Sequence, residues 1–198
     1  MALSNSTPLP FPASEPINTS SLFQPLQQDI VVEFAEQFTK LQGKFSFCMN
    51  EEELVANFNK LCSQNGWKNI YCTEPKLQTI LQQQEWYQDI KTCDVSVTTC
   101  ELLVARTGSI ILSAAKNGRI PSVYAPIHVC VAYTSQLVYD LTDALSEVKQ
   151  AYGQNLPSII TLATGPSRTA DIEKTLVVGV HGPKEVYCFL IDDQQQSL

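Results

Sequence analysis

The spacing of apolar residues along the first half of the chain alternates between the periods of helix and strand. Ile30, Phe34, Phe38 and Leu41 recur every three or four residues, which predicts a helix that ends at Gly43. The pattern then predicts, in order, a strand over 44–49, a helix over 50–65, a strand over 69–73 and a helix over 75–84. This β-α-β-α order is typical of a parallel sheet with crossover helices.

In the second half of the chain, apolar segments of strand length follow one another more closely. Strands are expected over 94–99, 109–113, 127–133, 159–163 and 185–191. The segment TCELLVARTG predicts a short helix that ends at Gly108, and AKNGR reads as a polar loop. Ser135 is expected to cap a helix to about Tyr152, whose inner face carries Leu137, Leu141, Leu145 and Val148. Strands in such close succession predict an α/β fold with a mixed, mostly parallel sheet.

The segment PSIITLATGPSRTADIE joins a strand pattern to a turn. Thr164-Gly165-Pro166 ends the apolar run, and Ser167 or Thr169 can cap a following helix that reaches about residue 178. Asp171 and Glu173 would lie in the first turn of that helix, where the helix dipole favours acids. Ligands of open α/β sheets sit past the carboxyl ends of strands, so this junction predicts a site for an anion or a polar ligand.

Charged residues near the turns allow two interpretations. Arg168 is the only fixed positive charge at the junction, and its planar fork suits a carboxylate or phosphate. It can equally pair with Asp171, three residues further along the expected helix. Glu101, Arg106 and Arg119 flank two other turns, and in one interpretation they complete a polar cleft. In the other, Glu101 and Arg106 form an exposed ion pair that contributes little to stability.

The chain contains two histidines in different settings. His128 lies inside an apolar strand pattern, which is typical of a hydrogen-bonded core residue. His181 lies in a glycine-flanked loop, where contact with a ligand is easier. A nucleophilic triad could be drawn from Ser109, Ser167, His181 and Asp171, but the chain has no G-x-S-x-G elbow. Triad chemistry is therefore a minor hypothesis.

Composition narrows the class of protein further. The chain has 198 residues and a formal charge of −7, which disfavours nucleic acid and anionic lipid as partners. It lacks a long apolar run and a secretion-signal pattern, so we expect a cytoplasmic protein without membrane insertion. The segment 1–28 holds five of the eleven prolines and predicts a flexible arm ahead of one domain over 29–198. Neither G-x-G-x-x-G nor a Walker A motif occurs, so no nucleotide cofactor is expected.

The seven cysteines are widely spaced and contain no C-x-x-C pair. That spacing is poor for zinc or an iron–sulfur cluster, so we expect no metal and mostly free, buried thiols. Cys93 and Cys100 flank a polar turn and are the expected exceptions. A weaker hypothesis makes this pair a redox sensor.

Three motifs together resemble a known family. ARTGSIILS, GRIPSVYAPIHVCV and TGPSRTADIEKTLVVGVHGPKEVYCFLID resemble the LUD-domain family of lactate-utilization proteins, in particular the C type, over about residues 30–192. The resemblance implies a three-layer α/β/α sandwich of the NagB/RpiA/CoA-transferase-like type. It also implies a role in oxidation of L-lactate to pyruvate beside iron–sulfur partner proteins.

The chain departs from the family pattern at two turns. Many relatives read A-E-T-G where this chain has Ala105-Arg106-Thr107-Gly108, which reverses a charge beside the predicted cleft. Many also read T-G-A-(D/E) where this chain has Thr98-Thr99-Cys100-Glu101, so that the acid is kept and the glycine becomes Thr99. A substrate or partner of different charge is one consequence we consider.

The primary hypothesis is therefore a subunit or accessory protein of a lactate-utilization system that acts with iron–sulfur proteins. The alternative is a stand-alone domain that binds or hydrolyses a phosphorylated or carboxylated molecule at the 164–169 turn. No residue is assigned a catalytic role. The candidate ligand-binding residues are Glu101, Arg106, Thr107, Gly108, Ser109, His128, Thr164, Gly165, Ser167, Arg168, Thr169, His181 and Gly182.

Overall fold

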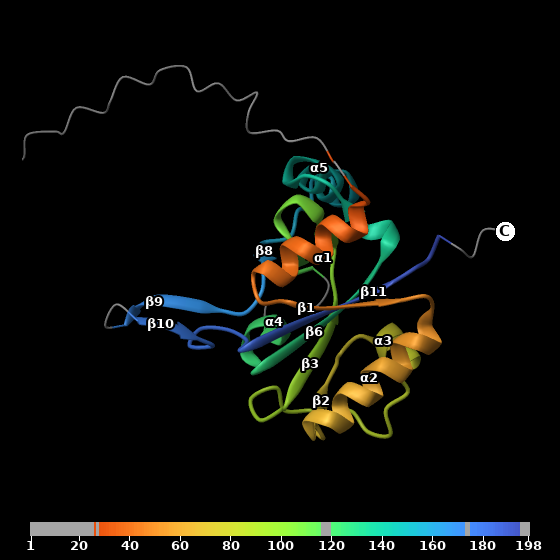
Figure 1. Cartoon of the computed structure of the whole chain (residues 1–198), viewed down its shortest axis with the longest axis vertical. Coiled ribbons are helices and arrows are strands. Elements are labelled where there is room, and N and C mark those ends of the chain that lie inside the picture. Colours follow the sequence, from red (N-terminus) through yellow and green to blue (C-terminus); the bar gives the residue numbers. More distant parts are fainter. Residues whose placement is uncertain (1–25, 27, 116–119, 173–174, 195–198) are drawn as a thin grey trace, which may run out of the picture.

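The computed structural model describes residues 26, 28–115, 120–172 and 175–194, which form an α/β structure (Figure 1). The expected arm over 1–28 lies almost wholly outside the described residues, and so does Arg119 with most of the expected AKNGR loop.

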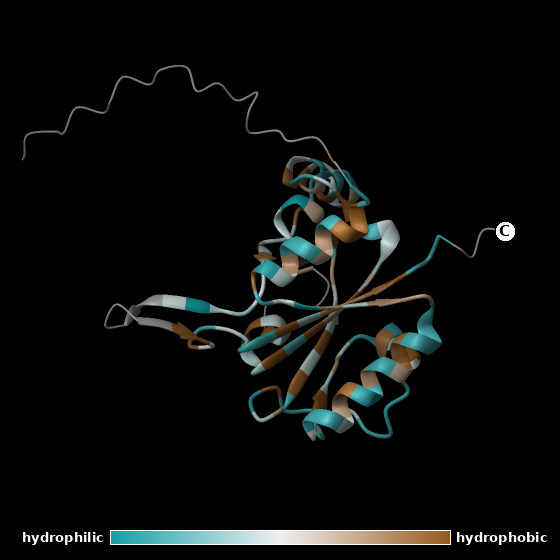
Figure 2. Cartoon of the chain, in the orientation of Figure 1, coloured by the Kyte–Doolittle hydropathy of each residue, from teal (hydrophilic) through white to brown (hydrophobic). Residues whose placement is uncertain are grey.

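Five parallel strands form the central sheet, in the order β1, β11, β6, β3, β2. Their bounds are β1 Lys44–Cys48, β2 Ile70–Tyr71, β3 Val95–Thr99, β6 Ile127–Tyr133 and β11 Glu185–Ile191. The two longest strands, β6 and β11, pair along their whole length, with Glu185 opposite Ile127 and Ile191 opposite Tyr133. Both are buried on two faces, which explains their nearly continuous apolar sequences (Figure 2).

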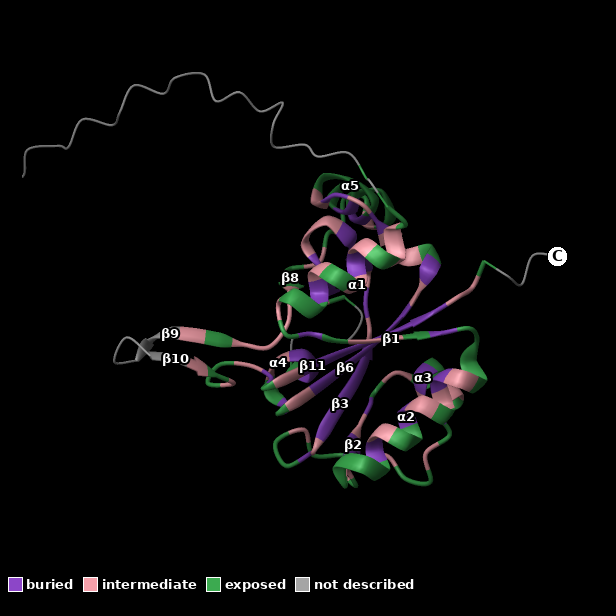
Figure 3. Cartoon of the chain, viewed as in Figure 1, coloured by how far each residue is buried: buried purple, intermediate pink, exposed green. Residues whose placement is uncertain are grey.

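Helices cover both faces of this sheet and give the expected three-layer α/β/α arrangement (Figure 1). Helices α2 (Glu51–Asn65) and α3 (Pro75–Leu81) lie on one face, and α1 (Ile30–Lys40) lies on the other. Successive side chains of the strands point to opposite faces of the central sheet, so they contribute to two hydrophobic cores, one on each face. Figure 3 colours the buried residues purple. On β6, Val129 belongs to the core under α2 and α3, whereas Cys130 belongs to the core under α1.

A second, smaller sheet stands beside the central one and has the strand order β7, β4, β5, β8. Its strands are β4 Leu102–Val104, β5 Ser109–Ser113, β7 Leu137–Val138 and β8 Ile160–Ala163. β4 runs parallel to β7, whereas β5 is antiparallel to both β4 and β8. The mixed character that the sequence predicts thus resides in this small sheet, and the central sheet is wholly parallel.

Local sequence explains where the first two helices begin and end. The Asp29 carboxylate accepts a hydrogen bond from the backbone N–H of Val31 at 2.9 Å, and the Asn50 side chain accepts one from Glu53 at 2.9 Å. Gly66 ends α2 with a φ of 68°. Both helices agree with the prediction from apolar spacing.

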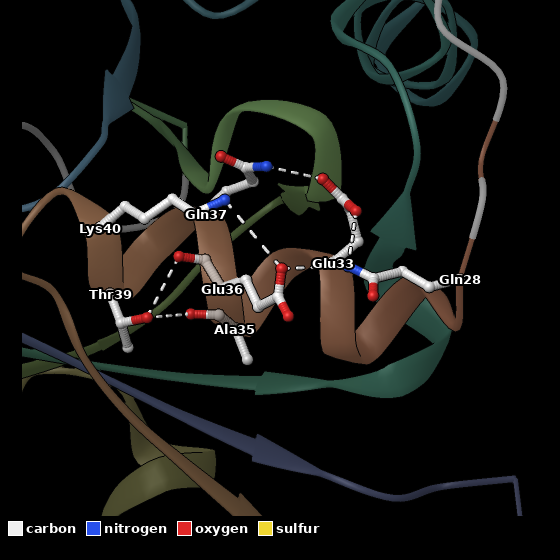
Figure 4. Close-up of polar contacts among 7 residues, drawn as sticks. All are labelled: Gln28, Glu33, Ala35, Glu36, Gln37, Thr39 and Lys40. Carbon is white, nitrogen blue, oxygen red and sulfur yellow. Dashed lines mark hydrogen bonds and ion pairs between the residues drawn. The ribbon is translucent and has the colours of Figure 1, made fainter.

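The outer face of α1 carries a network of side-chain hydrogen bonds (Figure 4). The Gln37 amide and the Gln28 amide each donate to Glu33 at 2.8 Å. These bonds, that from Gln37 above all, hold the pKa of Glu33 below its usual range. The Thr39 hydroxyl donates to the carbonyl oxygen of Ala35 at 2.7 Å, within the last turns of the helix. The inner face of α1 buries Phe34 and Phe38.

The fifth helix begins later than its apolar spacing predicts. Helix α5 spans Leu141–Tyr152 because Asp140 caps it, and the preceding residues form a short 3₁₀ turn and then β7. Leu145, which we predicted on the inner face, is 45% exposed, and Ala144 is buried in its place.

The segment TCELLVARTG is not the helix that we predicted. It forms β4 and then a 3₁₀ turn over Ala105–Thr107, which ends at Gly108 with a φ of 60°. The short helix α4 (Ile120–Tyr124) lies in a segment that we read as a loop. β-branched and aliphatic residues in LLV favour pairing with β5 over a helix too short to be stable.

The helix predicted after Pro166 is wrong as well. Residues Arg168–Ile172 form β9 and Thr175–Val178 form β10, which pair antiparallel as a separate two-stranded sheet. Threonine, isoleucine and valine dominate both segments, and this β-branched content outweighs the helix-capping pattern. Arg168 and Asp171 therefore do not lie three residues apart on a helix, as the predicted pair requires.

Candidate functional site

Two turns that are far apart in the sequence meet through a line of three hydroxyl groups. Ser109, at the start of β5, has its Oγ 2.8 Å from the Oγ1 of Thr107 and 3.3 Å from the Oγ1 of Thr164. Antiparallel pairing places Ile110 opposite Ala163, which brings the start of β5 beside the end of β8. The turn at 105–109 and the turn at 164–168 thus form one polar region.

Both turns press against α1. Gly108 and Gly165 have φ values of 60° and 105°, in the region that favours glycine. A Cβ atom at Gly108 would lie well inside van der Waals distance of the Phe38 backbone, and one at Gly165 would collide with the Leu41 carbonyl oxygen. The Nη2 of Arg168 donates a hydrogen bond to that same Leu41 oxygen. The end of α1 therefore serves as the platform on which both turns rest.

The glycine-flanked loop at 179–183 closes the other side of this region. The backbone N–H of Ser167 donates to the Pro183 carbonyl oxygen at 2.9 Å, and the N–H of Gly179 donates to the Ser167 oxygen at 2.9 Å. A Cβ atom at Gly182 would come within 2.9 Å of the Ser167 Cβ, so glycine allows the close approach. These contacts place His181 at the 164–168 turn.

The result is a pocket of about 460 Å³ between β8, the 164–168 turn, the 181–183 loop and α4. Six candidate residues line it, namely Thr164, Gly165, Ser167, Arg168, His181 and Gly182. Ser122 and Thr161 also line it and were not among our candidates. Ser122 lies on α4, which the sequence pattern gave no means of predicting, and Thr161 looked like an ordinary residue of a strand. Thr169 follows on β9, opposite Val177.

The charge of this pocket differs from that of the chain as a whole. The chain carries a formal charge of −7, yet the described lining residues include Arg168 and His181 but no aspartate or glutamate. Hydroxyl groups of Thr161, Thr164 and Ser167 supply donors around the same space. Such a lining suits a small anion, a carboxylate or a phosphate ester.

The pocket lies at opposite ends of the strands in the two sheets. It follows the carboxyl end of β8, but β8 belongs to the small sheet. Relative to the central sheet it lies near the amino ends of β6 and β11, where the Lys184 N–H donates to the Pro126 oxygen at 2.7 Å. The usual rule for open parallel sheets places ligands at the opposite edge.

Glu101 and Arg106 lie outside the pocket and do not pair with each other as one interpretation had it. The Nε of Arg106 is 2.6 Å from the Oδ2 of Asp140, the residue that caps α5. A backbone hydrogen bond from Thr142 and the neighbouring Arg106 together hold the pKa of Asp140 below its usual range.

Glu101 joins the small sheet to α5 instead. The Tyr152 hydroxyl donates to Glu101 Oε1 at 2.7 Å, and the Ser113 hydroxyl donates to the same oxygen. The Glu101 N–H donates to the Ile111 carbonyl oxygen at 2.8 Å. These contacts make Glu101 a residue that positions structural elements.

His128 is completely buried on β6. Its Nε2 lies 2.8 Å from the Thr98 Oγ1, and its Nδ1 has no hydrogen-bond partner among the described residues. Burial lowers its pKa to about 4, so the ring is neutral at physiological pH. The interpretation as a core histidine agrees with this burial.

All seven cysteines lie among the described residues, none is in a disulfide, and all are buried, including Cys93 and Cys100, which we expected to be exceptions. Burial raises the pKa of Cys93 to about 11, which disfavours a reactive thiolate. Within the described residues, no three histidine, cysteine or acidic side chains are grouped as metal ligands. No helix in the described ranges combines the length and apolar character needed to cross a bilayer.

Comparison with known proteins defines the family of this chain. The sequence profile of the LUD domain matches residues 67–191. The chain belongs to the LUD domain family.

Several curated relatives carry the name "Lactate utilization protein C". The Bacillus licheniformis protein is 36% identical over 110 residues, which are 54% of this chain and 46% of that protein. The Bacillus subtilis protein is 34% identical over 114 residues, 56% of this chain and 48% of that one. "Lactate utilization protein C 1" of Bacillus mycoides is 34% identical over 140 residues, 69% of this chain and 60% of that one. The chain thus spans about half the length of most of these relatives.

A solved structure supports the fold independently. The crystal structure of a DUF162 family protein from Deinococcus radiodurans superposes with a TM-score of 0.62, at 17% identity, over 82% of this chain and 96% of that one. At this identity the likeness concerns the fold alone.

Proposed function

We propose that this chain is a cytoplasmic component of a lactate-utilization system, in which L-lactate is oxidised to pyruvate with iron–sulfur proteins as partners. Its membership of the LUD domain family and its 34–36% identity to proteins named for lactate utilization support this role. Removal of two electrons from lactate requires an acceptor. We assign the iron–sulfur clusters to the partner proteins because the cysteines of this chain are buried and dispersed.

One observation supports a ligand-binding role for this chain. The described residues that line the 460 Å³ pocket include no aspartate and no glutamate. In a chain of net charge −7, a pocket lined by Arg168, His181 and several hydroxyls favours an anionic ligand. Lactate and pyruvate are both small carboxylates, so the pocket fits the proposed system chemically. Three of the polar groups, those of Thr164, Ser167 and Arg168, come from one continuous turn and are held in place by the bonds to α1 and to Pro183.

The test begins with the tagged protein in its own cells, grown on L-lactate. We expect the affinity-purified protein to bring iron–sulfur proteins with it and the eluate to reduce a dye when lactate is added. A strain that lacks the gene should grow poorly on L-lactate. Clean recovery of this chain alone, together with normal growth of the deletion strain when it has no second lactate route, would overturn the proposal.

Two variants separate the pocket from the rest of the surface. His181→Ala removes an exposed lining residue, whereas Lys60→Ala removes an exposed cation on α2, on the far side of the central sheet. We expect His181→Ala to lower the lactate-dependent activity several-fold and Lys60→Ala to leave it unchanged. Equal activity of both variants would show that the pocket has no part in the function.

The same pocket also supports an alternative proposal, a stand-alone domain that binds or hydrolyses a phosphorylated or carboxylated molecule. A thermal-shift screen of sugar phosphates, short carboxylates and CoA esters tests it on the purified chain. A ligand that raises the melting temperature of the wild type but not of His181→Ala would support it. If no such ligand is found and partners are recovered, the lactate-utilization proposal stands alone.

A further inference from the structure

Strands β9 and β10 form a ribbon that leaves the body of the protein (Figure 1). The ribbon is a separate sheet, and in the described part of the chain its strands pair only with each other. Its base is fixed where the Gly179 N–H donates to the Ser167 oxygen at 2.9 Å. An isolated two-stranded hairpin is marginally stable in water, and each of its strands has an open edge of backbone donors and acceptors.

The β10 side of this ribbon continues into an exposed apolar patch. Val178 and Val180 are 40% and 41% exposed, and Ile120 and Tyr124 of α4 are 56% and 61% exposed. Tyr124 and Val180 line the same pocket of about 570 Å³, so the patch runs from the hairpin to α4. Apolar surface gathered beside an open strand edge marks a protein-interaction site.

The two edges of the ribbon differ in charge. The β10 sequence TLVV has no charged residue and no proline, the two features with which proteins usually block an open edge. The β9 sequence RTADI carries both Arg168 and Asp171. An uncharged edge can pair with an identical edge without placing like charges opposite each other.

We propose that a second copy of this chain docks on this surface, with β10 of one copy paired antiparallel to β10 of the other across a two-fold axis. The two ribbons then form one four-stranded sheet in the order β9, β10, β10, β9. A two-fold interface uses the same surface of both copies, and an antiparallel strand pair is the arrangement that such an axis produces. The contact also removes the apolar patch of Ile120, Tyr124, Val178 and Val180 from water. This inference does not depend on the proposed function.

The test is the mass of the full-length protein in solution, measured by light scattering after size exclusion over a range of micromolar concentrations. We expect twice the chain mass of 22.0 kDa. In the proposed pair Val178 lies at the two-fold axis, opposite Val178 of the second copy, so Val178→Lys would bring like charges together and should weaken the dimer at least tenfold. Leu145→Lys is the matched control, because Leu145 is 45% exposed but lies on α5, and it should remain a dimer.

Charge complementation gives a result that mere misfolding of a variant cannot imitate. Val178→Lys and Val178→Glu should each be monomeric alone and form a mixed dimer when combined. As a second approach, replacement of residues 169–177 by a short glycine linker keeps the hydrogen bond from Arg168 to Leu41 and should give a monomer that is still folded, since the hairpin lies outside the hydrophobic cores. A monomeric wild type, a dimeric Val178→Lys variant, or no mixed dimer would each overturn the proposal.

Discussion

Arg168 donates a hydrogen bond from its guanidinium group to the backbone carbonyl oxygen of Leu41, just past the last residue of α1. The bond joins the base of the β9–β10 hairpin to a helix whose last carbonyl groups lack partners within the helix. A positive charge at this end also suits the helix dipole. The cation that we singled out for ligand binding therefore has a structural task, and α1, the small sheet and the hairpin meet at one point.

Removal of this arginine should have a modest effect on stability. Because Arg168 is exposed, we expect Arg168→Ala to lower the free energy of unfolding by about 1 kcal/mol, the usual value for a hydrogen bond and less than for a bond from a buried charged group. Arg168→Lys should recover part of the loss through the helix dipole alone. Urea denaturation measures both, with Lys60→Ala as the control for loss of an exposed cation. A loss of several kcal/mol would mean that Arg168 holds more of the structure than this one bond.

The glycines of the two turns should be much less tolerant of substitution than their φ values alone indicate. Gly66 has a φ of 68° and open space around it, so Gly66→Ala should lose about 1 kcal/mol from backbone strain alone. Gly108→Ala has a similar φ but also forces a Cβ against the Phe38 backbone, which adds about 1–3 kcal/mol for overpacking. Gly165→Ala should behave like Gly108→Ala because its Cβ meets the Leu41 oxygen.

Thermal or urea unfolding of these three variants checks this order. Equal losses at Gly66 and Gly108 would show that α1 moves away without penalty. In that case α1 could not be the rigid platform of the pocket.

Much of the fold follows from local patterns. The three strands over 109–113, 127–133 and 185–191 agree with the apolar runs residue for residue, because central strands buried on both faces have sequences with sharp ends. Helices α1 and α2 follow from their caps and apolar spacing. Division of the described strands into three sheets could not be predicted, because strand pairing is a long-range property that alternation along one segment does not encode.

Only part of the candidate site follows from local sequence, because its other contacts join residues that are far apart in the chain. The sequence singled out the glycine-containing turns at 164–168 and 179–183, and the structure brings them together through Ser167 and Pro183. The hairpin was read as a helix because Ser167, Asp171 and Glu173 imitate a helix start. The partners of Glu101 and Arg106, Tyr152 and Asp140, are 51 and 34 residues away in the sequence, so no local spacing reveals them.

His128 should make the protein less stable as the pH falls below neutrality. Burial lowers the pKa of His128 from 6.5 to about 4, so between these values the unfolded chain binds a proton that the folded chain excludes. Stability is therefore lost as the pH falls from about 6.5 to 4, and the loss from this group is roughly 3 kcal/mol.

The measurement is the free energy of unfolding in urea at several pH values, in the wild type and in His128→Asn. Carboxylates titrate in both proteins, so the difference between the two curves isolates the histidine. We expect that difference to shrink as the pH falls. His181→Asn, which removes the exposed histidine, is the control and should keep the wild-type dependence. Parallel curves for the wild type and His128→Asn would rule out exclusion of the proton.

Glu101 and Tyr152 should be coupled energetically. The Tyr152 hydroxyl donates to the Glu101 carboxylate at 2.7 Å and so joins α5 to the loop between β3 and β4. In a double-mutant cycle of Glu101→Gln and Tyr152→Phe, the two losses should overlap by about 1 kcal/mol, the usual value for such a bond. Glu101→Gln combined with Tyr124→Phe, which alters an exposed tyrosine, should be additive. Additivity in both cycles would show that the bond contributes nothing in solution.

The stability of the fold should depend on Arg106, because its guanidinium group lies beside the Asp140 carboxylate. An acid in place of Arg106 would stand next to the carboxylate that caps α5. Arg106→Gln should lower the free energy of unfolding by about 1 kcal/mol, given the partial exposure of the pair, and Arg106→Glu by about 1 kcal/mol more through repulsion.

The pH dependence of stability tests whether Arg106 acts through its charge. Arg106 helps to hold the pKa of Asp140 below its usual 3.8, so the pair stabilises the fold above that pH and loses its effect as Asp140 becomes protonated below it. The difference between the wild type and Arg106→Gln should thus be full at pH 7 and smaller in strong acid. Urea denaturation at both pH values measures it, with Lys60→Gln as the matched control. A difference that does not change with pH would mean that Arg106 acts through packing of its side chain and not through its charge.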